Sequence, residues 1–241
     1  MNLTNNEKKK VLVFAATYNE SGNINELINS IFNHNNEVHA LFIDDNSPDK
    51  TSDIINELKK KFKNINLIIR KKKLGLDTAH KEAFKFAIDK NYDYLITMDA
   101  DLSHDPKEIN NFIYNLRNYP FVIGSRYMKG GKCEMQGYRL FLSYFGNKFI
   151  KFILNSKYSE FTTSYRGFNL NKLEDFNLDI VKNSGYSFFM SVVFELEKKN
   201  YNIKEIPITF YERSFGKSKI EKIEIFRTFK NLLFYFFKKN F

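Results

Sequence analysis

The sequence lacks several features of secreted and membrane-spanning proteins. Its 241 residues include one cysteine, Cys133, so no disulfide can form within the chain, and the composition suits a reducing compartment. The first seven residues lack the charged and then apolar order of a signal peptide, and we expect residues 1–8 to form a flexible tail. The longest apolar candidate, residues 231–237, is far shorter than the roughly 20 residues that cross a bilayer. We therefore expect a cytoplasmic protein that is soluble or peripheral on a membrane.

Tryptophan is absent and no nucleic-acid-binding motif is recognisable, although the formal net charge is +10 at pH 7. A positive balance of this size fits nucleic acid, anionic lipid headgroups or phosphorylated substrates as partners. A lysine- and asparagine-rich composition accounts for part of the excess, because the lysine triplets at 8–10, 59–61 and 71–73 lie at the ends of predicted elements. We expect these triplets to be solvated loops, and we predict no nucleic-acid partner.

Apolar runs alternate with helical periodicity through the first half of the chain. Strands are predicted at 11–15, 38–43, 66–70, 94–98 and 121–123, and helices at 24–32, 54–62, 79–87 and 106–116. Strands that alternate with helices imply right-handed crossovers and a mainly parallel α/β sheet with helices on both faces. A hydrophobic content of 43% is ample for the core of such a sheet.

The second half of the chain is less regular. We predict an aromatic-rich helix over 138–154, a strand at 164–169, a helix at 188–199 and an edge strand at 203–210 that contains Pro207. Ser218 would cap a last helix. No internal repeat or linker is visible, so we expect one domain over residues 9–217, followed by an amphipathic C-terminal helix over 218–241 that associates with a membrane.

Two carboxylates, Asp99 and Asp101, follow the predicted strand 94–98, and Asp44 follows the second strand. The carboxyl ends of parallel strands meet at the edge where open α/β folds bind ligands. Hard cations such as Mg²⁺ or Mn²⁺ favour one or two carboxylates plus substrate phosphates, so the pair predicts a metal–diphosphate site. The alternatives are an Asp-rich turn before Pro106 and, for Asp44, a polar turn with a helix cap instead of a nucleoside contact.

Other polar residues are predicted at the same edge. Residues 16–20 present backbone N–H groups there or open the first helix, and Gly75 would let the backbone pass near a ligand. Arg126 follows strand 121–123, and its guanidinium suits a phosphate. Further cations are expected on one side of the cleft, where they suggest a second phosphorylated ligand: Arg139, Arg166, Arg213, Lys217 and Lys219.

Taken in order, these segments resemble family 2 glycosyltransferases of the dolichol-phosphate (polyprenol-phosphate) mannosyltransferase group. The resemblance spans residues 11 to about 220. It rests on residues 17–20, 44–49, 75, 98–104 and 124–127, on Arg139 with Ser143 and Asn147, and on 160–167 and 213–219. The chain departs from the group at Ala16, where proline is usual, at Ser103, where some members have glutamine, and at Glu160, where aspartate is usual.

The resemblance implies a GT-A type, Rossmann-like fold and inverting transfer of a hexose from a nucleotide sugar to a polyprenyl or dolichyl phosphate. Mannose is the expected hexose and GDP-mannose the expected donor. It implies that Mg²⁺ or Mn²⁺ binds at Asp99 and Asp101. It also implies that the protein associates peripherally with the cytosolic face of a membrane and can have a membrane-anchoring partner subunit. The implied donor site is Thr17, Tyr18, Glu20, Asp44, Asp99, Ala100, Asp101, Arg213 and Lys219; the implied acceptor-phosphate site is Arg126, Arg139 and Ser143; the implied catalytic residues are Asp99, Asp101, Arg126 and Arg213.

The chemistry of the acceptor separates the alternatives. A phosphate monoester has a second pKa of about 6, so it is mostly dianionic at neutral pH and needs no strong base. A sugar or lipid hydroxyl needs one, and Glu160 is the obvious candidate. A family 2 glycosyltransferase with a glycan or lipid hydroxyl as acceptor therefore stays open. A nucleotidyltransferase would need a Gly-rich, Lys-bearing N-terminal loop, which we do not find, and a basic binding module predicts that Asp99→Asn leaves function intact.

Overall fold

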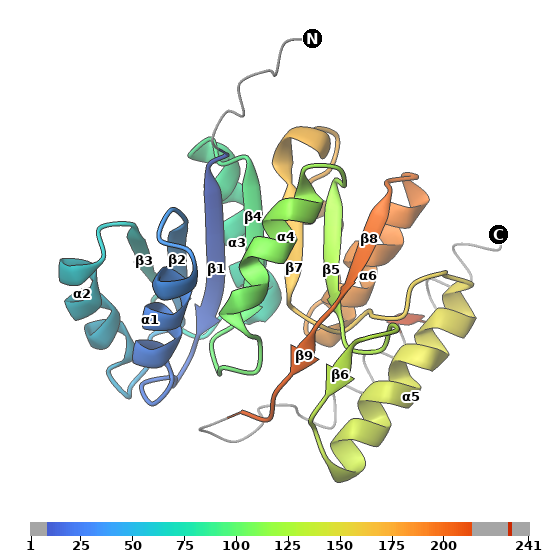
Figure 1. The fold of residues 1–241 in the computed structure, drawn as a ribbon, viewed down its shortest axis with the longest axis horizontal. Helices are drawn as coiled ribbons and strands as arrows, with labels where there is room; N and C mark the ends of the chain where they lie inside the picture. The colour runs from blue at the N-terminus through green and yellow to red at the C-terminus, as the bar shows by residue number, and fades with distance from the viewer. Residues whose placement is uncertain (1–8, 214–230, 233–241) are drawn as a thin grey trace.

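A seven-stranded sheet forms the centre of the molecule, and helices cover both of its faces (Figure 1). The computed structural model describes residues 9–213 and 231–232. The strand order is β3-β2-β1-β4-β7-β5-β8. The strands are β1 (Val11–Thr17), β2 (His39–Asp44), β3 (Ile65–Ile69), β4 (Tyr94–Asp99), β5 (Phe121–Ser125), β7 (Arg166–Asn169) and β8 (Ile203–Pro207).

The sheet is mainly parallel, as predicted, because β7 is the one strand that runs against its neighbours β4 and β5. β8 lies at an edge of the sheet, where Pro207 removes no ladder hydrogen bond from a central strand. The predicted strand 203–210 is two strands, because residues Thr209–Phe210 (β9) leave the main sheet. They pair with β6 (Lys132–Cys133) in a small second sheet that lies below the main one in Figure 1.

The helices divide between the two faces according to two hydrophobic cores. α1 (Ile24–His34), α2 (Thr51–Lys61) and α4 (Ile109–Leu116) pack with one core, and α3 (Leu76–Asp89), α5 (Gly137–Leu154) and α6 (Tyr186–Lys198) with the other. In β1, Leu12 and Phe14 enter the second core, whereas Val11 and Val13 enter the first. Both faces of the central strands are therefore buried, which explains their continuous apolar runs. Three short 3₁₀ turns complete the described chain: η1 (Pro106–Glu108), η2 (Leu170–Lys172) and η3 (Leu178–Ile180).

The ends of the chain lie largely outside the described residues. The predicted tail at 1–8 and most of the predicted helix at 218–241 belong to this part, so both stay predictions. Within the C-terminal segment, Leu232 is buried in the core, and Asn231 Nδ2 donates to Ser187 Oγ of α6 at 2.9 Å. Among the helices that the structure describes, none combines the length and apolarity that a membrane crossing requires.

The register of the strands brings the predicted ligand-binding residues to one edge. Thr17 lies opposite Asp44 of β2, and Ala16 lies opposite Asp99 of β4. The loops that follow β1, β2 and β4 therefore start side by side at the carboxyl edge of the sheet. This is the edge at which open α/β folds bind ligands.

Candidate active site

A serine hydroxyl group fixes one carboxylate oxygen of Asp99, and another fixes one of Asp101. Asp99 ends β4, and its Oδ1 accepts a hydrogen bond from Ser164 Oγ at 2.5 Å. Asp101 Oδ1 accepts from Ser103 Oγ at 2.5 Å and from Ser103 N at 3.1 Å. Because a carboxylate can accept at both oxygens, Oδ2 of Asp99 is left for another partner, whereas Oδ2 of Asp101 pairs with Arg213.

The ring of His104 contacts Asp99 and is neutral. It is fully buried, and burial lowers its pKa. Its Nδ1 accepts a hydrogen bond from Asp99 N at 3.0 Å, so the ring proton is on Nε2, which donates to Thr163 Oγ1 at 3.2 Å. The approach of Nδ1 to Asp99 Oδ2 at 3.7 Å is therefore no ion pair. His104 supports the backbone of the site instead of binding a ligand.

Arg213 reaches Asp101 because the segment around β9 pairs with the loop after β4. Tyr211 N donates to Ser103 O at 3.0 Å, and Phe210 forms an antiparallel bridge with His104. This pairing places Arg213 Nη2 2.9 Å from Asp101 Oδ2. The expected closeness of Arg213 to the carboxylate pair is thus present, whereas Lys217 and Lys219 lie outside the described residues.

The donor atoms of this pair fit a hard divalent cation. Desolvation at the base of the site raises the pKa of Asp99, although its side chain is partly exposed, and a nearby cation would favour the ionised form. In the described part of the chain, no group of three or more His, Cys, Asp or Glu side chains could enclose a metal. An ion at Asp99 and Asp101 would therefore take its other ligands from phosphate oxygens and water, as Mg²⁺ does in phosphate sites.

Asp44 organises the loop that follows β1. It is fully buried, its Oδ2 accepts from Thr17 Oγ1 at 2.8 Å and from Ser47 Oγ at 2.6 Å, and its Oδ1 accepts from Ser47 N at 2.8 Å. The polar turn proposed as the alternative is present. A direct contact of Asp44 with a nucleoside stays a prediction.

The other predicted donor residues surround this loop. Lys73 Nζ lies 4.7 Å above the ring of Tyr18, and Glu20 Oε2 accepts from Asn23 Nδ2 at 2.8 Å at the start of α1. Ala100, which lies between Asp99 and Asp101 in the sequence, is buried.

Sequence reasoning missed the role of Asp45. Its Oδ1 lies 2.5 Å from Arg70 Nη2, both side chains are buried, and Arg70 also donates to Thr78 Oγ1 and to the carbonyl of Gly75. Gly75, at the start of α3, has a φ of +99°, a backbone conformation that residues with a side chain rarely adopt. The ion pair therefore fixes the loop 71–75, and the Asp44-Asp45 doublet was the signal that could have revealed it.

Arg126 is held by Glu160 in a buried, bidentate ion pair. Arg126 Nε lies 2.7 Å from Glu160 Oε2, and Nη2 lies 2.8 Å from Oε1 and 2.8 Å from Thr162 Oγ1. Glu160 Oε1 also accepts from the backbone N–H groups of Thr162 and Thr163. Burial raises the pKa of Glu160, but the guanidinium outweighs burial and holds that pKa below its usual value. Glu160 is thus enclosed, fully hydrogen-bonded and a poor base.

Arg139 and Ser143 lie one turn apart on α5, so they share a face of this helix. Ser143 Oγ accepts from Tyr127 OH at 2.6 Å, which joins this face to the residue after Arg126. Arg139 Nε is buried without a hydrogen-bond partner among the described residues. Buried donors without partners are rare, and Arg139 Nε points to an anionic ligand at this place.

The placement of Arg166 in the cleft was wrong. Its side chain is fully buried in β7, where Nε, Nη1 and Nη2 donate to the carbonyls of Thr163, Phe189 and Phe161. Burial lowers the pKa of Arg166 to about 9, so the guanidinium stays charged at neutral pH. It fixes the backbone beside the site, and its guanidinium does not face the cleft where ligands are expected to bind.

Sequence comparison identifies the family to which the chain belongs. The model of glycosyl transferase family 2 matches residues 12–176. An undecaprenyl-phosphate mannosyltransferase of Micrococcus luteus is 31% identical over 212 residues, which are 88% of this chain and 87% of that protein. A polyprenol monophosphomannose synthase of Mycolicibacterium smegmatis is 32% identical over 215 residues, which are 88% of this chain and 81% of that protein.

Comparison with solved structures shows which known structures share the fold of this chain. A mannosyltransferase from Pyrobaculum calidifontis in complex with GDP-Man and Mn²⁺ matches with a TM-score of 0.59 and 15% identity, over 88% of this chain and 59% of that one. A glucosyl-3-phosphoglycerate synthase from Mycobacterium tuberculosis, in complex with Mn²⁺, UDP and glucosyl-3-phosphoglycerate, matches with a TM-score of 0.65 and 12% identity, over 93% and 77%. The predicted GT-A type fold is confirmed.

Proposed function

This chain belongs to glycosyl transferase family 2 and is a glycosyltransferase, and we propose that it transfers a hexose, with inversion, from a nucleotide sugar to a polyprenyl phosphate. The named activities of the two curated relatives support a mannosyl group and a polyprenyl phosphate. GDP-mannose is then the proposed donor. The observation that carries the acceptor assignment is the buried, unpartnered Nε of Arg139, on the helix face that it shares with Ser143.

The donor half of the reaction depends on Asp99 and Asp101. We assign them as the ligands of Mg²⁺ or Mn²⁺, in keeping with the Mn²⁺ in the structural relatives. When bound, the ion neutralises charge on the departing nucleoside diphosphate. Arg213 is held beside Asp101 and adds positive charge at the same place. Thr17, Tyr18, Glu20 and Asp44 would form the nucleoside side of the donor site, with Ala100 between the metal ligands and Lys219 as a further cation toward the diphosphate.

In the acceptor half of the reaction, the protein must orient the phosphate of the acceptor but need not remove a proton from it. A phosphate monoester is already ionised at neutral pH, and guanidinium groups bind such oxygens with paired hydrogen bonds. A hydroxyl acceptor would need a base, and Glu160 cannot serve because Arg126 and two backbone N–H groups use its oxygens. The geometry therefore favours the phosphate acceptor over a glycan or lipid hydroxyl.

Replacing Arg139 with Ala tests the acceptor site. Charge-assisted hydrogen bonds contribute about 1.5–3 kcal/mol, so the KM for polyprenyl phosphate is expected to rise about tenfold or more while the KM for the nucleotide sugar stays unchanged. Lys85→Ala is the control, because Lys85 is an exposed cation of α3, away from α5. A rise in the nucleotide-sugar KM without a change in the acceptor KM would assign Arg139 to the donor site.

We further propose that α5 lies on a membrane surface. The helix exposes aromatic side chains that a core would bury: Tyr138 is 70% exposed, Phe141 54%, Phe145 50% and Phe152 79%. Aromatic faces with neighbouring lysines bind the interface of anionic bilayers. α5 also carries Arg139, on the side opposite Phe141 and Phe152, so the acceptor site would lie about one helix diameter, roughly 10 Å, from the lipid surface. The cytosolic side of the membrane and an anchoring subunit stay predictions.

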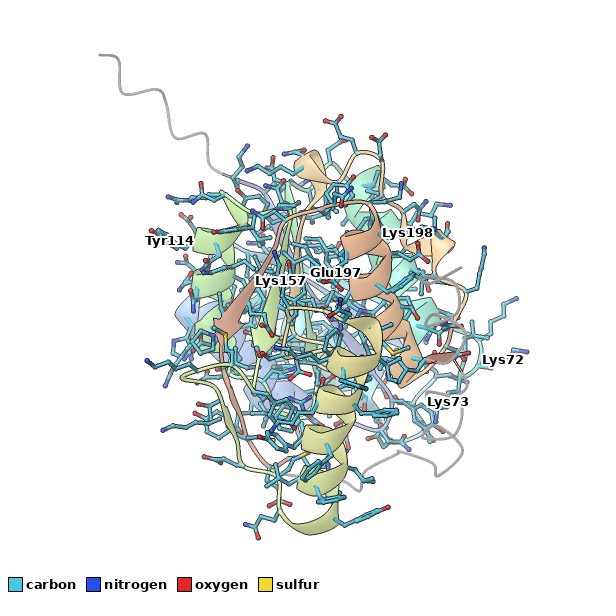
Figure 2. The ribbon with its side chains drawn as sticks, turned by 90° about the vertical axis from the view of Figure 1, so that its right-hand side faces the viewer. Lys72, Lys73, Tyr114, Lys157, Glu197 and Lys198 are labelled. Atoms are coloured by element: carbon cyan, nitrogen blue, oxygen red, sulfur yellow. The ribbon has the colours of Figure 1, made fainter. Side chains whose placement is uncertain are left out.

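The double variant Phe141→Ser/Phe152→Ser tests this surface. Two partly inserted phenyl rings account for more than 1.4 kcal/mol, so binding to vesicles that contain anionic lipid is expected to weaken by about tenfold or more. Tyr114→Ser is the control, because Tyr114 is 65% exposed on α4, at the left of Figure 2, whereas α5 faces the viewer. Equal vesicle binding by the double variant and the wild type, in a sedimentation assay, would refute this surface.

A further inference from the structure

The segment 160–164 contacts the acceptor half of the site at one end. Glu160 and Thr162 both hold the guanidinium of Arg126, at distances of 2.7–2.8 Å. Thr162 Oγ1 also accepts from Asn147 Nδ2 of α5 at 3.1 Å. This end of the segment therefore determines where Arg126 lies relative to α5.

The other end of the segment contacts Asp99, one of the two proposed metal ligands. Ser164 Oγ donates to Asp99 Oδ1 at 2.5 Å, and the Ser164 carbonyl accepts from Thr97 Oγ1 of β4 at 2.5 Å. Thr163 Oγ1 accepts from His104, whose other ring nitrogen binds the backbone N–H of Asp99. Asp99 is thus held at its side chain and at its backbone by two adjacent residues.

The segment between these ends is rigid. Arg166 donates to the carbonyls of Phe161 and Thr163 at 2.9 Å each, and Asn147 Oδ1 accepts from Phe161 N at 2.7 Å. Glu160, Phe161, Thr163 and Ser164 are buried. Because the backbone is fixed at several points over five residues, each end of the segment is held in place independently of the other.

We propose that Ser164 is a positioning residue, and that through it segment 160–164 sets the place of the Asp99 carboxylate relative to the acceptor-binding guanidinium of Arg126. This inference rests on the proposed function. The single hydroxyl proton of Ser164 occupies Oδ1, which orients the carboxylate and leaves Oδ2 for the metal. Partners that hydrogen-bond a metal ligand in this way typically account for about 10- to 100-fold in metal affinity.

Mn²⁺ binding in the presence of GDP, followed by the electron paramagnetic resonance signal of free Mn²⁺, tests the role of Ser164. Ser164→Ala is expected to weaken Mn²⁺ binding about 10- to 100-fold and to leave the KM for polyprenyl phosphate unchanged. Thr162→Val is expected to do the reverse, raising that KM about three- to tenfold with unchanged Mn²⁺ binding. Ser191→Ala is the matched control, since Ser191 is a buried serine of α6 whose hydroxyl donates to Ser187 O.

Each result has a definite meaning. Unchanged Mn²⁺ binding by Ser164→Ala would overturn the inference, and so would an equal loss in Ser164→Ala and Ser191→Ala, because the effect would then be general destabilisation. Thr97→Val removes the bond to the Ser164 carbonyl without touching the side chain of Asp99, and it should weaken Mn²⁺ binding in the same direction. Failure of the wild type to bind Mn²⁺ with GDP would contradict the proposed function itself.

Discussion

Replacing Asp101 with Asn is expected to reduce turnover of the nucleotide sugar by on the order of 10²–10³-fold. The substitution removes one of the two proposed carboxylate ligands, and a bound ion would supply several kcal/mol of stabilisation to the departing diphosphate. It also removes the charge that holds Arg213 at 2.9 Å, so the second cation at the diphosphate is displaced as well. In the wild type, a chelator should abolish turnover, and Mg²⁺ or Mn²⁺ should restore it.

Asp53→Asn is the matched control for this substitution, because Asp53 is an exposed aspartate of α2 away from the strand ends. Steady-state rates and melting temperatures of both variants separate loss of the metal from loss of the fold. Full activity of the wild type in excess chelator, or of Asp101→Asn at low Mn²⁺ concentration, would remove Asp101 from the metal site.

Replacing Glu160 with Gln is expected to destabilise the protein by about 3–5 kcal/mol, because the substitution leaves Arg126 as an uncompensated buried charge. For a chain of this length, the melting temperature should fall by roughly 6–20 °C. The pKa of Glu160 is lowered in the folded state, so the pair stabilises the protein above the ordinary glutamate pKa of about 4.3. This stabilisation is lost as the pH falls through the lowered folded pKa.

Two further variants make the Glu160 experiment decisive. Glu57→Gln removes the carboxylate of an exposed pair with Lys60 and should change stability by no more than about 0.5 kcal/mol. Glu160→Asp keeps a carboxylate, and a part of the stability should return. A Glu160→Gln protein of normal melting temperature whose turnover with a hydroxyl acceptor falls by about 10²–10⁴-fold would instead show a general base.

The first half of the fold was predictable because its strands are buried on both faces and carry continuous apolar runs. The direction of β7 was not predictable, since an antiparallel strand and a parallel strand of four residues have the same pattern. β6 has two residues and no periodicity, and it exists because β9 pairs with it. The pairing of the β9 segment with the loop after β4 carries Arg213 to Asp101, so a local pattern could not reveal how this contact is made.

In the candidate site, too, residues that follow a strand were predictable, whereas contacts between distant segments were not. Asp99 and Asp101 were predictable because they directly follow a buried strand. The partner of Arg126 lies 34 residues away along the chain, and only the folded chain brings Glu160 beneath it. Arg166 was placed wrongly because an arginine in sequence suggests exposure, whereas three carbonyl oxygens from distant segments satisfy it in the core.

The most direct test of the central claim is the transfer reaction itself. Purified protein is incubated with Mn²⁺ and a panel of labelled nucleotide sugars, with and without a polyprenyl phosphate, and the products are separated by extraction into organic solvent. The proposed function predicts a labelled hexosyl phosphoryl lipid, of inverted anomeric configuration, that forms from GDP-mannose only when both the polyprenyl phosphate and the divalent ion are present. Label transfer to a glycan without any lipid phosphate, or no turnover of any nucleotide sugar, would contradict it.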